Sequence, residues 1–121
     1  MDIETKFNFS SQICTTIEQS VRLLALGLKE ETADCCWTID ERDNIIICLI
    51  DDAVEYIEHA WSLHRLLLII PKEVNIDGYI FPLRSDAVMR MNEADDMYEY
   101  VIGVLERTIK QGYFNKEYLK E

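Results

Sequence analysis

Two short acidic stretches that nearly repeat each other carry the residues best suited to chemistry in this chain. The first places Asp51 and Asp52 before Glu55, and Glu58 follows three residues later. The second, residues 95–101, has the same order of two aspartates, two other residues, a glutamate and a tyrosine. Carboxylates four residues apart share one face of a helix, and Mg²⁺ binds such oxygen ligands. Acidic runs are more commonly solvated faces of surface helices, so we predict no metal site and no cofactor.

Two four-residue motifs point to one enzyme class. Glu55-Tyr-Ile-Glu58 and Glu93-Ala-Asp-Asp96 resemble the Glu-x-x-Glu and Glu-x-x-Asp motifs of the all-α nucleoside triphosphate pyrophosphohydrolases. That resemblance implies a Mg²⁺-dependent hydrolase in which these four carboxylates hold the metal. The stretch between the two motifs is longer than is usual in that family and contains an expected hairpin. The hydrolase is therefore an alternative to our main hypothesis.

Other residue types that often serve catalysis lie in less favourable patterns. His59 and His64 are five residues apart and would point to different sides of a helix. The adjacent Cys35 and Cys36 could form a redox or metal pair, but small buried hydrophobic residues are the commoner role. The four glycines are isolated, so the sequence contains no phosphate-binding loop. We predict no catalytic residue, and the patterns favour a non-enzymatic protein.

The negative charge is concentrated in one quarter of the chain. The 121 residues carry a formal net charge of −11. Residues 31–60 hold nine acidic side chains and one basic side chain, which gives −8 for this block. A pI near 4.5 argues against DNA or RNA, because phosphate contacts need clustered Lys and Arg. It argues equally against an anionic membrane surface and leaves a basic protein as the expected partner.

The chain shows neither a targeting signal nor a membrane span. Its first residues lack a basic region followed by an apolar run. Apolar runs such as 66–70 are far too short to cross a bilayer. The four cysteines have irregular spacing, which favours reduced thiols over a disulfide framework. We therefore expect a cytoplasmic protein.

Helical periodicity predicts three long helices, over residues 12–29, 41–70 and 86–111. We expect Thr15, with an acidic residue three positions later, to cap the first of them. An Asp-Gly pair between alternating apolar residues predicts a β-hairpin over 74–82. The expected fold is thus a mainly α single domain, 1–121, with three helices in a bundle-like arrangement and one short hairpin between the second and third.

Residues 44–50 are ambiguous between strand and helix. Their isoleucines favour a strand that would form a hairpin with 35–39. Apolar residues at helical spacing nevertheless continue from Ile46 towards Pro71. We prefer the long helix and keep the hairpin as the alternative.

Our main hypothesis is a non-enzymatic acidic binding protein. The concrete form is an antagonist or immunity-type inhibitor that covers a basic surface on a toxin, nuclease or defence protein. Clustered carboxylates steer association with a positive partner, and exposed aromatic residues often anchor an interface. The candidate contact residues are Asp40, Glu41, Asp43, Asp51, Asp52, Glu55, Glu58, Tyr79 and Phe81. A structural homodimer with no ligand is a further alternative, because a second copy is the simplest partner.

Overall fold

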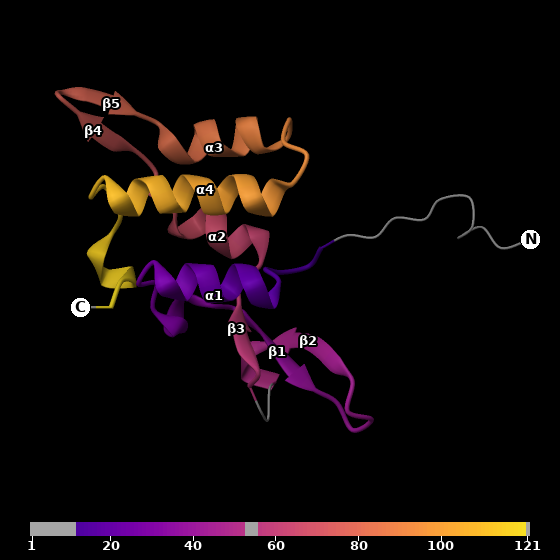
Figure 1. Cartoon of the computed structure of the whole chain (residues 1–121). Helices are drawn as coiled ribbons and strands as arrows, with labels where there is room; N and C mark the ends of the chain where they lie inside the picture. The colour runs from indigo at the N-terminus through magenta and orange to yellow at the C-terminus, as the bar shows by residue number, and fades with distance from the viewer. Residues whose placement is uncertain (1–11, 53–55, 121) are drawn as a thin grey trace, which may run out of the picture.

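The chain folds as a mixed α/β structure, so the predicted mainly α bundle is wrong. The structure is a computed structural model that describes residues 12–52 and 56–120. Of the described residues, 45% are helical and 20% lie in strands, and they form four α-helices and five strands in two sheets. The helices lie between a three-stranded sheet at one end and a two-stranded hairpin at the other (Figure 1).

Two strands of a three-stranded sheet lie in the region predicted as the second helix. The strands of this sheet, β1 (Cys35–Ile39), β2 (Ile45–Leu49) and β3 (Glu58–Ala60), lie in the order β2-β1-β3, and both pairings are antiparallel. A 3₁₀ turn, η3 (Ile50–Asp52), follows β2, and α2 (Leu63–Ile69) is the one α-helix among the described residues of this region. The helix predicted over 41–70 is therefore wrong, and the hairpin kept as the alternative is the one that forms.

The apolar run explains why periodicity failed here. Every residue from 45 to 50 is apolar, so the run matches a helical period and a strand equally well. The turn before this run favours the strand over the helix. Asp43 adopts a positive φ of 63°, a conformation that Asp and Asn tolerate in tight turns. The turn brings the β-branched isoleucines of β2 beside β1, where branched side chains pack well.

The other helices are shorter than predicted. α1 (Ile17–Ala25) lies inside the expected 12–29. The helix expected over 86–111 is divided into α3 (Leu83–Met91) and α4 (Met97–Lys110). The break occurs where Asp96 caps the N-terminus of α4. Its side chain accepts a hydrogen bond from the backbone N–H of Glu99 at 3.1 Å, and such a cap begins a new helix.

Glycine ends α1 and α4 in the same way. Gly27 and Gly112 have φ of 101° and 79°, which glycine adopts without strain. After α4, the Gly112 N–H donates to the carbonyl of Ile109 and the Tyr113 N–H donates to that of Thr108. This pair of bonds is a Schellman motif. The last helix was expected to end at residue 111, which is the C-cap of α4.

The predicted hairpin over 74–82 is also confirmed. β4 (Val74–Ile76) pairs antiparallel with β5 (Tyr79–Phe81). The two turn residues, Asp77 and Gly78, have φ of 51° and 89°, the positive values of a type I′ turn.

Two apolar clusters form the interior. The larger one joins the four helices, and its fully buried side chains include Leu23, Leu66, Ile102 and Leu105. The smaller one lies under the three-stranded sheet and contains Cys14, Cys35 and Ala60, with Trp37 and Ile47 packed against it. The sheet therefore has a separate apolar contact with the rest of the molecule.

Thr15 joins these two parts through buried hydrogen bonds. Its N–H donates to the Trp61 carbonyl at 2.8 Å, and its Oγ1 accepts from the Trp61 N–H at 3.0 Å. Its carbonyl accepts from Nε1 of Trp37 in β1 at 3.0 Å. Oγ1 also shares a hydrogen bond with the hydroxyl of Ser20 in α1 at 2.8 Å. The expected cap role is wrong: Thr16 caps α1, in a capping box with Gln19, while Thr15 holds helix and sheet together.

In the part of the chain that the structure describes, every helix is too short or too polar to cross a bilayer.

We predict that Thr15→Val destabilises the protein more than Thr15→Ser. Valine removes Oγ1 and leaves the buried Trp61 N–H without its acceptor, which costs about 1–3 kcal/mol. Serine keeps the oxygen and loses one methyl group, at about 1 kcal/mol. Urea unfolding curves measure both changes. Equal midpoints for the two variants would show that the hydroxyl does not hold the structure together.

Candidate functional site

The turn between β1 and β2 holds three of the predicted contact residues. Its shape comes from Asp40, whose Oδ1 accepts from the backbone N–H groups of Asn44 at 2.9 Å and Arg42 at 2.8 Å. The hydrogen bond from the Asn44 backbone is the largest cause of a lowered pKa for the Asp40 carboxyl, with Arg42 adding to it. Glu41 and Asp43 are exposed in the same turn. We call residues 39–51, the turn with β2 and Asp51, the acidic hairpin.

The acidic hairpin is not neutralised by ion pairs. The described residues contain three salt bridges: Arg22 with Glu99 at 2.8 Å, Arg90 with Asp86 at 2.9 Å and Lys110 with Glu106 at 3.1 Å. All six side chains belong to α1, α3 or α4. These three cations pair within the helical part. The acidic hairpin holds four carboxylates and one cation, Arg42, so its net negative field extends into solvent.

The remaining residues of the first acidic stretch do not form one cluster. Asp51 and Asp52 both belong to η3, directly after β2, and Asp51 is exposed. Glu58 is half-buried in β3, where its Oε1 accepts from the His59 N–H at 3.1 Å. Glu55 lies outside the described residues. Asp51 is therefore the member of this stretch that joins the turn carboxylates.

The second acidic stretch has structural duties. Asp96 caps α4, and Glu99 accepts from Nε2 of Gln19 at 2.7 Å besides pairing with Arg22. The Arg22 hydrogen bond, followed by that of Gln19, lowers the pKa of Glu99. The first copy of the stretch continues into a strand and the second into a helix, so the repeated letters do not mark a structural repeat.

The carboxylates of the hydrolase alternative are not arranged on neighbouring helices. Glu58 lies in β3, whereas Glu93 follows α3 and Asp96 precedes α4. Within residues 12–52 and 56–120, no three His, Cys, Asp or Glu side chains are grouped closely enough to hold a metal ion.

The aromatic contact residues lie far from the acidic ones. Tyr79 is 64% exposed, and its ring centroid is 6.5 Å from that of the half-buried Phe81. Their hairpin, β4–β5, is at the opposite end of the molecule from the three-stranded sheet (Figure 1). The turn carboxylates and the aromatic contact residues, all of them described, thus lie on two separate surfaces.

Strand β2 adds an apolar surface that the helix prediction concealed. Ile45 is 56% exposed and Leu49 is 62% exposed, and Ile39 and Ile46 are exposed beside them. The sequence signal was the β propensity of residues 44–50, and it gave no indication of which side chains would remain in solvent. The acidic hairpin therefore combines an apolar strand with carboxylates at both ends.

The cysteines do not form a vicinal pair. Cys35 and Cys36 point to opposite faces of the sheet, because side chains alternate along a strand. Cys36 instead lies opposite Cys48 of β2, with their sulfur atoms 3.6 Å apart. Burial raises the pKa of Cys36 to about 11 and that of Cys14 to about 12, so these thiols are poor nucleophiles at neutral pH.

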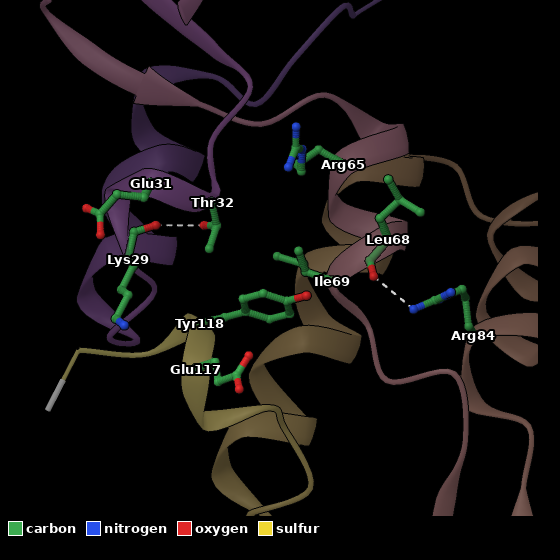
Figure 2. Close-up of a pocket in the computed structure, with 9 residues that line it drawn as sticks. All are labelled: Lys29, Glu31, Thr32, Arg65, Leu68, Ile69, Arg84, Glu117 and Tyr118. Atoms are coloured by element: carbon green, nitrogen blue, oxygen red, sulfur yellow. Dashed lines mark hydrogen bonds between the residues drawn. The ribbon is translucent and has the colours of Figure 1, made fainter.

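A hollow of about 630 Å³ lies between the C-terminal region and α2 (Figure 2). Its charged lining residues, none of which was a predicted site residue, are Lys29, Glu31, Arg65, Arg84 and Glu117. They come from four separate regions, so no local sequence pattern could have grouped them. The three cations and two carboxylates leave the hollow with mixed charge and no preference for a ligand of one sign.

Arg84 has a structural role in this hollow. Its guanidinium donates to the carbonyl of Leu68 at 2.8 Å (Figure 2) and to that of Ile70 at 2.8 Å. These are carbonyls at the end of α2, which lack helical partners. The residues that line the hollow include no serine, cysteine or histidine, so they supply none of the common nucleophile and base pairs.

In comparisons with known proteins, no family model, no curated protein and no solved structure matches the chain.

We predict that the Asp40 carboxyl titrates below its ordinary pKa of 3.8. A lowered pKa in the folded state stabilises the hairpin above the ordinary value, and this stabilisation is lost as the pH falls through the folded value. NMR titration of the Asp40 carboxyl carbon and of the Arg42 and Asn44 amide protons measures it. In Asp40→Asn the same amides should lose this pH response. A carboxyl that titrates at or above 3.8 would contradict the turn geometry.

We predict that Cys48 is the first thiol to react with iodoacetamide at pH 8. It is half-buried, whereas Cys14 and Cys36 are buried, and a pKa of about 11 leaves about one Cys36 thiol in a thousand ionised. Mass spectrometry of quenched samples gives the order of labelling. Cys48→Ser should remove the fast phase, and denaturant should equalise the remaining thiols. Alkylation of native Cys14 as fast as Cys48 would contradict this order.

Proposed function

We propose that the protein is a non-enzymatic binding protein whose acidic hairpin contacts a basic surface on a partner protein. The observation that carries the proposal is the separation of charge. The salt bridges of the described residues all lie on the helices, while Glu41, Asp43 and Asp51 are exposed without an ion pair at the sheet end. Carboxylates that are not paired within the chain are available to a positive partner.

An antagonist is the concrete form of this function. A toxin, nuclease or defence protein that binds nucleic acid needs clustered Lys and Arg for its phosphate contacts. A rigid set of carboxylates can cover such a surface and compete with the nucleic acid. The turn is preorganised by the hydrogen bonds that Asp40 accepts from the Arg42 and Asn44 backbone, and preorganisation reduces the entropy lost on binding.

We also infer that the protein acts in the cytoplasm. All four cysteines are free thiols, including Cys36 and Cys48, whose sulfur atoms face each other. A reducing compartment maintains thiols in this state. The aromatic hairpin with Tyr79 and Phe81 remains a second predicted contact surface, at the other end of the molecule.

We predict that removing charge from the acidic hairpin slows association with the partner, whereas the same change elsewhere does not. The test variant is Glu41→Gln, Asp43→Asn and Asp51→Asn. The control removes three exposed carboxylates outside the hairpin: Glu73→Gln, Glu93→Gln and Asp95→Asn. Both keep Asp40 and both change the net charge by +3. Partners captured from cell extract are identified by mass spectrometry, and the purified partner is measured by surface plasmon resonance.

We expect the test variant to lower the association rate by about tenfold, because steering acts on the encounter step. Binding by the unaltered chain should also weaken as salt rises, since the Debye length is about 8 Å at physiological ionic strength. A partner bound equally by both variants and at all salt concentrations would refute the proposal.

A further inference from the structure

We propose that the partner binds as an extended strand added antiparallel to the free edge of β2, with basic residues placed against Asp43 and Asp51. This inference rests on the proposed function and specifies the kind of partner. Its basis is the combination of an unpaired strand edge, exposed apolar side chains and a carboxylate at each end.

The free edge follows from the hydrogen-bond pattern of the hairpin. In an antiparallel pair of strands, the backbone N–H and C=O groups of one residue bond to the partner strand, and those of the next residue point away from it. The Asp40 N–H donates to the Asn44 carbonyl at 2.9 Å, and the Ile50 N–H donates to the Asp34 carbonyl at 3.2 Å. Even-numbered residues of β2 therefore bond to β1. The N–H and C=O groups of Ile45, Ile47 and Leu49 point away from β1, where no described strand pairs with them.

The side chains make this edge unusual. Natural edge strands are commonly protected by charged residues, proline or bulges. Residues 44–50 contain neither a charge nor a proline, and β2 pairs with β1 without a bulge. Ile45 and Leu49 remain more than half exposed. A partner strand would cover apolar surface and satisfy the backbone groups together, as in other cases of strand addition.

The charges select the partner. If two copies of the chain paired antiparallel through residues 44–50, the register would be centred on Ile47. Asp43, in the turn before β2, would then lie near Asp51 of the other copy, in the η3 turn after β2. Like charges directly opposite each other destabilise a strand pair, and the chains also repel through their net charge of −11. A strand with Lys or Arg at both ends reverses the sign of both contacts.

The probe is a synthetic peptide that matches this surface, Lys-Thr-Val-Thr-Val-Thr-Val-Thr-Lys. It places its valines opposite Ile45, Ile47 and Leu49 of β2, and one lysine beyond each end of that strand, on the side of Asp43 and of Asp51. Fluorescence anisotropy of the labelled peptide with the full chain gives affinity, and NMR shifts of the β2 amides give the location. A peptide with Glu in place of both Lys residues is the charge control.

Two N-methylated peptides test strand addition itself. Methylation of the valine nitrogens removes the donors that would face β2, whereas methylation of the threonine nitrogens alters donors that face solvent. We expect methylation of the valine nitrogens to weaken binding at least about tenfold, and methylation of the threonine nitrogens to leave binding nearly unchanged. The Glu peptide should bind at least about tenfold more weakly than the Lys peptide.

Variants of the protein give the matched test from the other side. Leu49→Pro removes an N–H that faces away from β1, and proline is tolerated at such edge positions. Leu49→Ala removes the same side chain and keeps the N–H. We expect Leu49→Pro to bind the Lys peptide at least about tenfold more weakly than Leu49→Ala. The peptide comparison remains decisive if Leu49→Pro does not fold.

Three results would overturn the inference. If both methylated peptides bind equally well and the Glu peptide does not bind, the edge recognises charge but does not add a strand. No binding of the Lys peptide would remove the proposed partner class from this edge. A dimer of the chain itself, detected by ultracentrifugation and abolished in Leu49→Pro, would show that a second copy occupies the edge.

Discussion

The fold depends on the buried hydrogen bonds of Thr15. The helical core and the apolar cluster under the sheet are separate, so apolar packing alone does not fix their relative position. Thr15 bonds to the backbone of Trp61, to the indole of Trp37 and to Ser20. Unpaired polar groups in the interior are costly, so each of these groups is stable only in this arrangement. The position of the acidic hairpin relative to the helices follows from it.

A second buried set extends the same junction. The Trp61 indole N–H donates to Oγ1 of Thr32 at 2.9 Å, and the Asp34 carboxylate accepts from the Ser62 N–H at 2.9 Å and from the Ser62 hydroxyl. These bonds hold the beginning of β1 against the beginning of α2. The described residues contain no buried side-chain nitrogen or oxygen atom without a partner, so the polar groups of the junction are satisfied.

The acidity of the chain has two different physical meanings. On the helices, carboxylates cap an N-terminus, as Asp96 does, or pair with a cation, as Glu99 does with Arg22. On the sheet, Asp40 shapes its own turn and its neighbours face solvent. The first set stabilises the fold. The second set creates a negative field beside an uncharged strand edge, and a monomer gains no evident stability from that combination.

Local patterns determined the elements whose geometry depends on a few adjacent residues. Asp77-Gly78 specified the β4–β5 hairpin, and Gly112 specified the end of α4, because both need positive φ values that these residues accept. The sequence also located the acidic block.

The tertiary structure decided the state of residues 45–50, since a continuous apolar run has no period of its own and β1 supplied the partner strand. It also decided which carboxylates are neutralised: Arg22 and Glu99 are 77 residues apart and meet only when α1 and α4 pack. Charge pairing and strand exposure depend on contacts between distant segments, so the site could be placed from the sequence only as a list of residues and not as a surface.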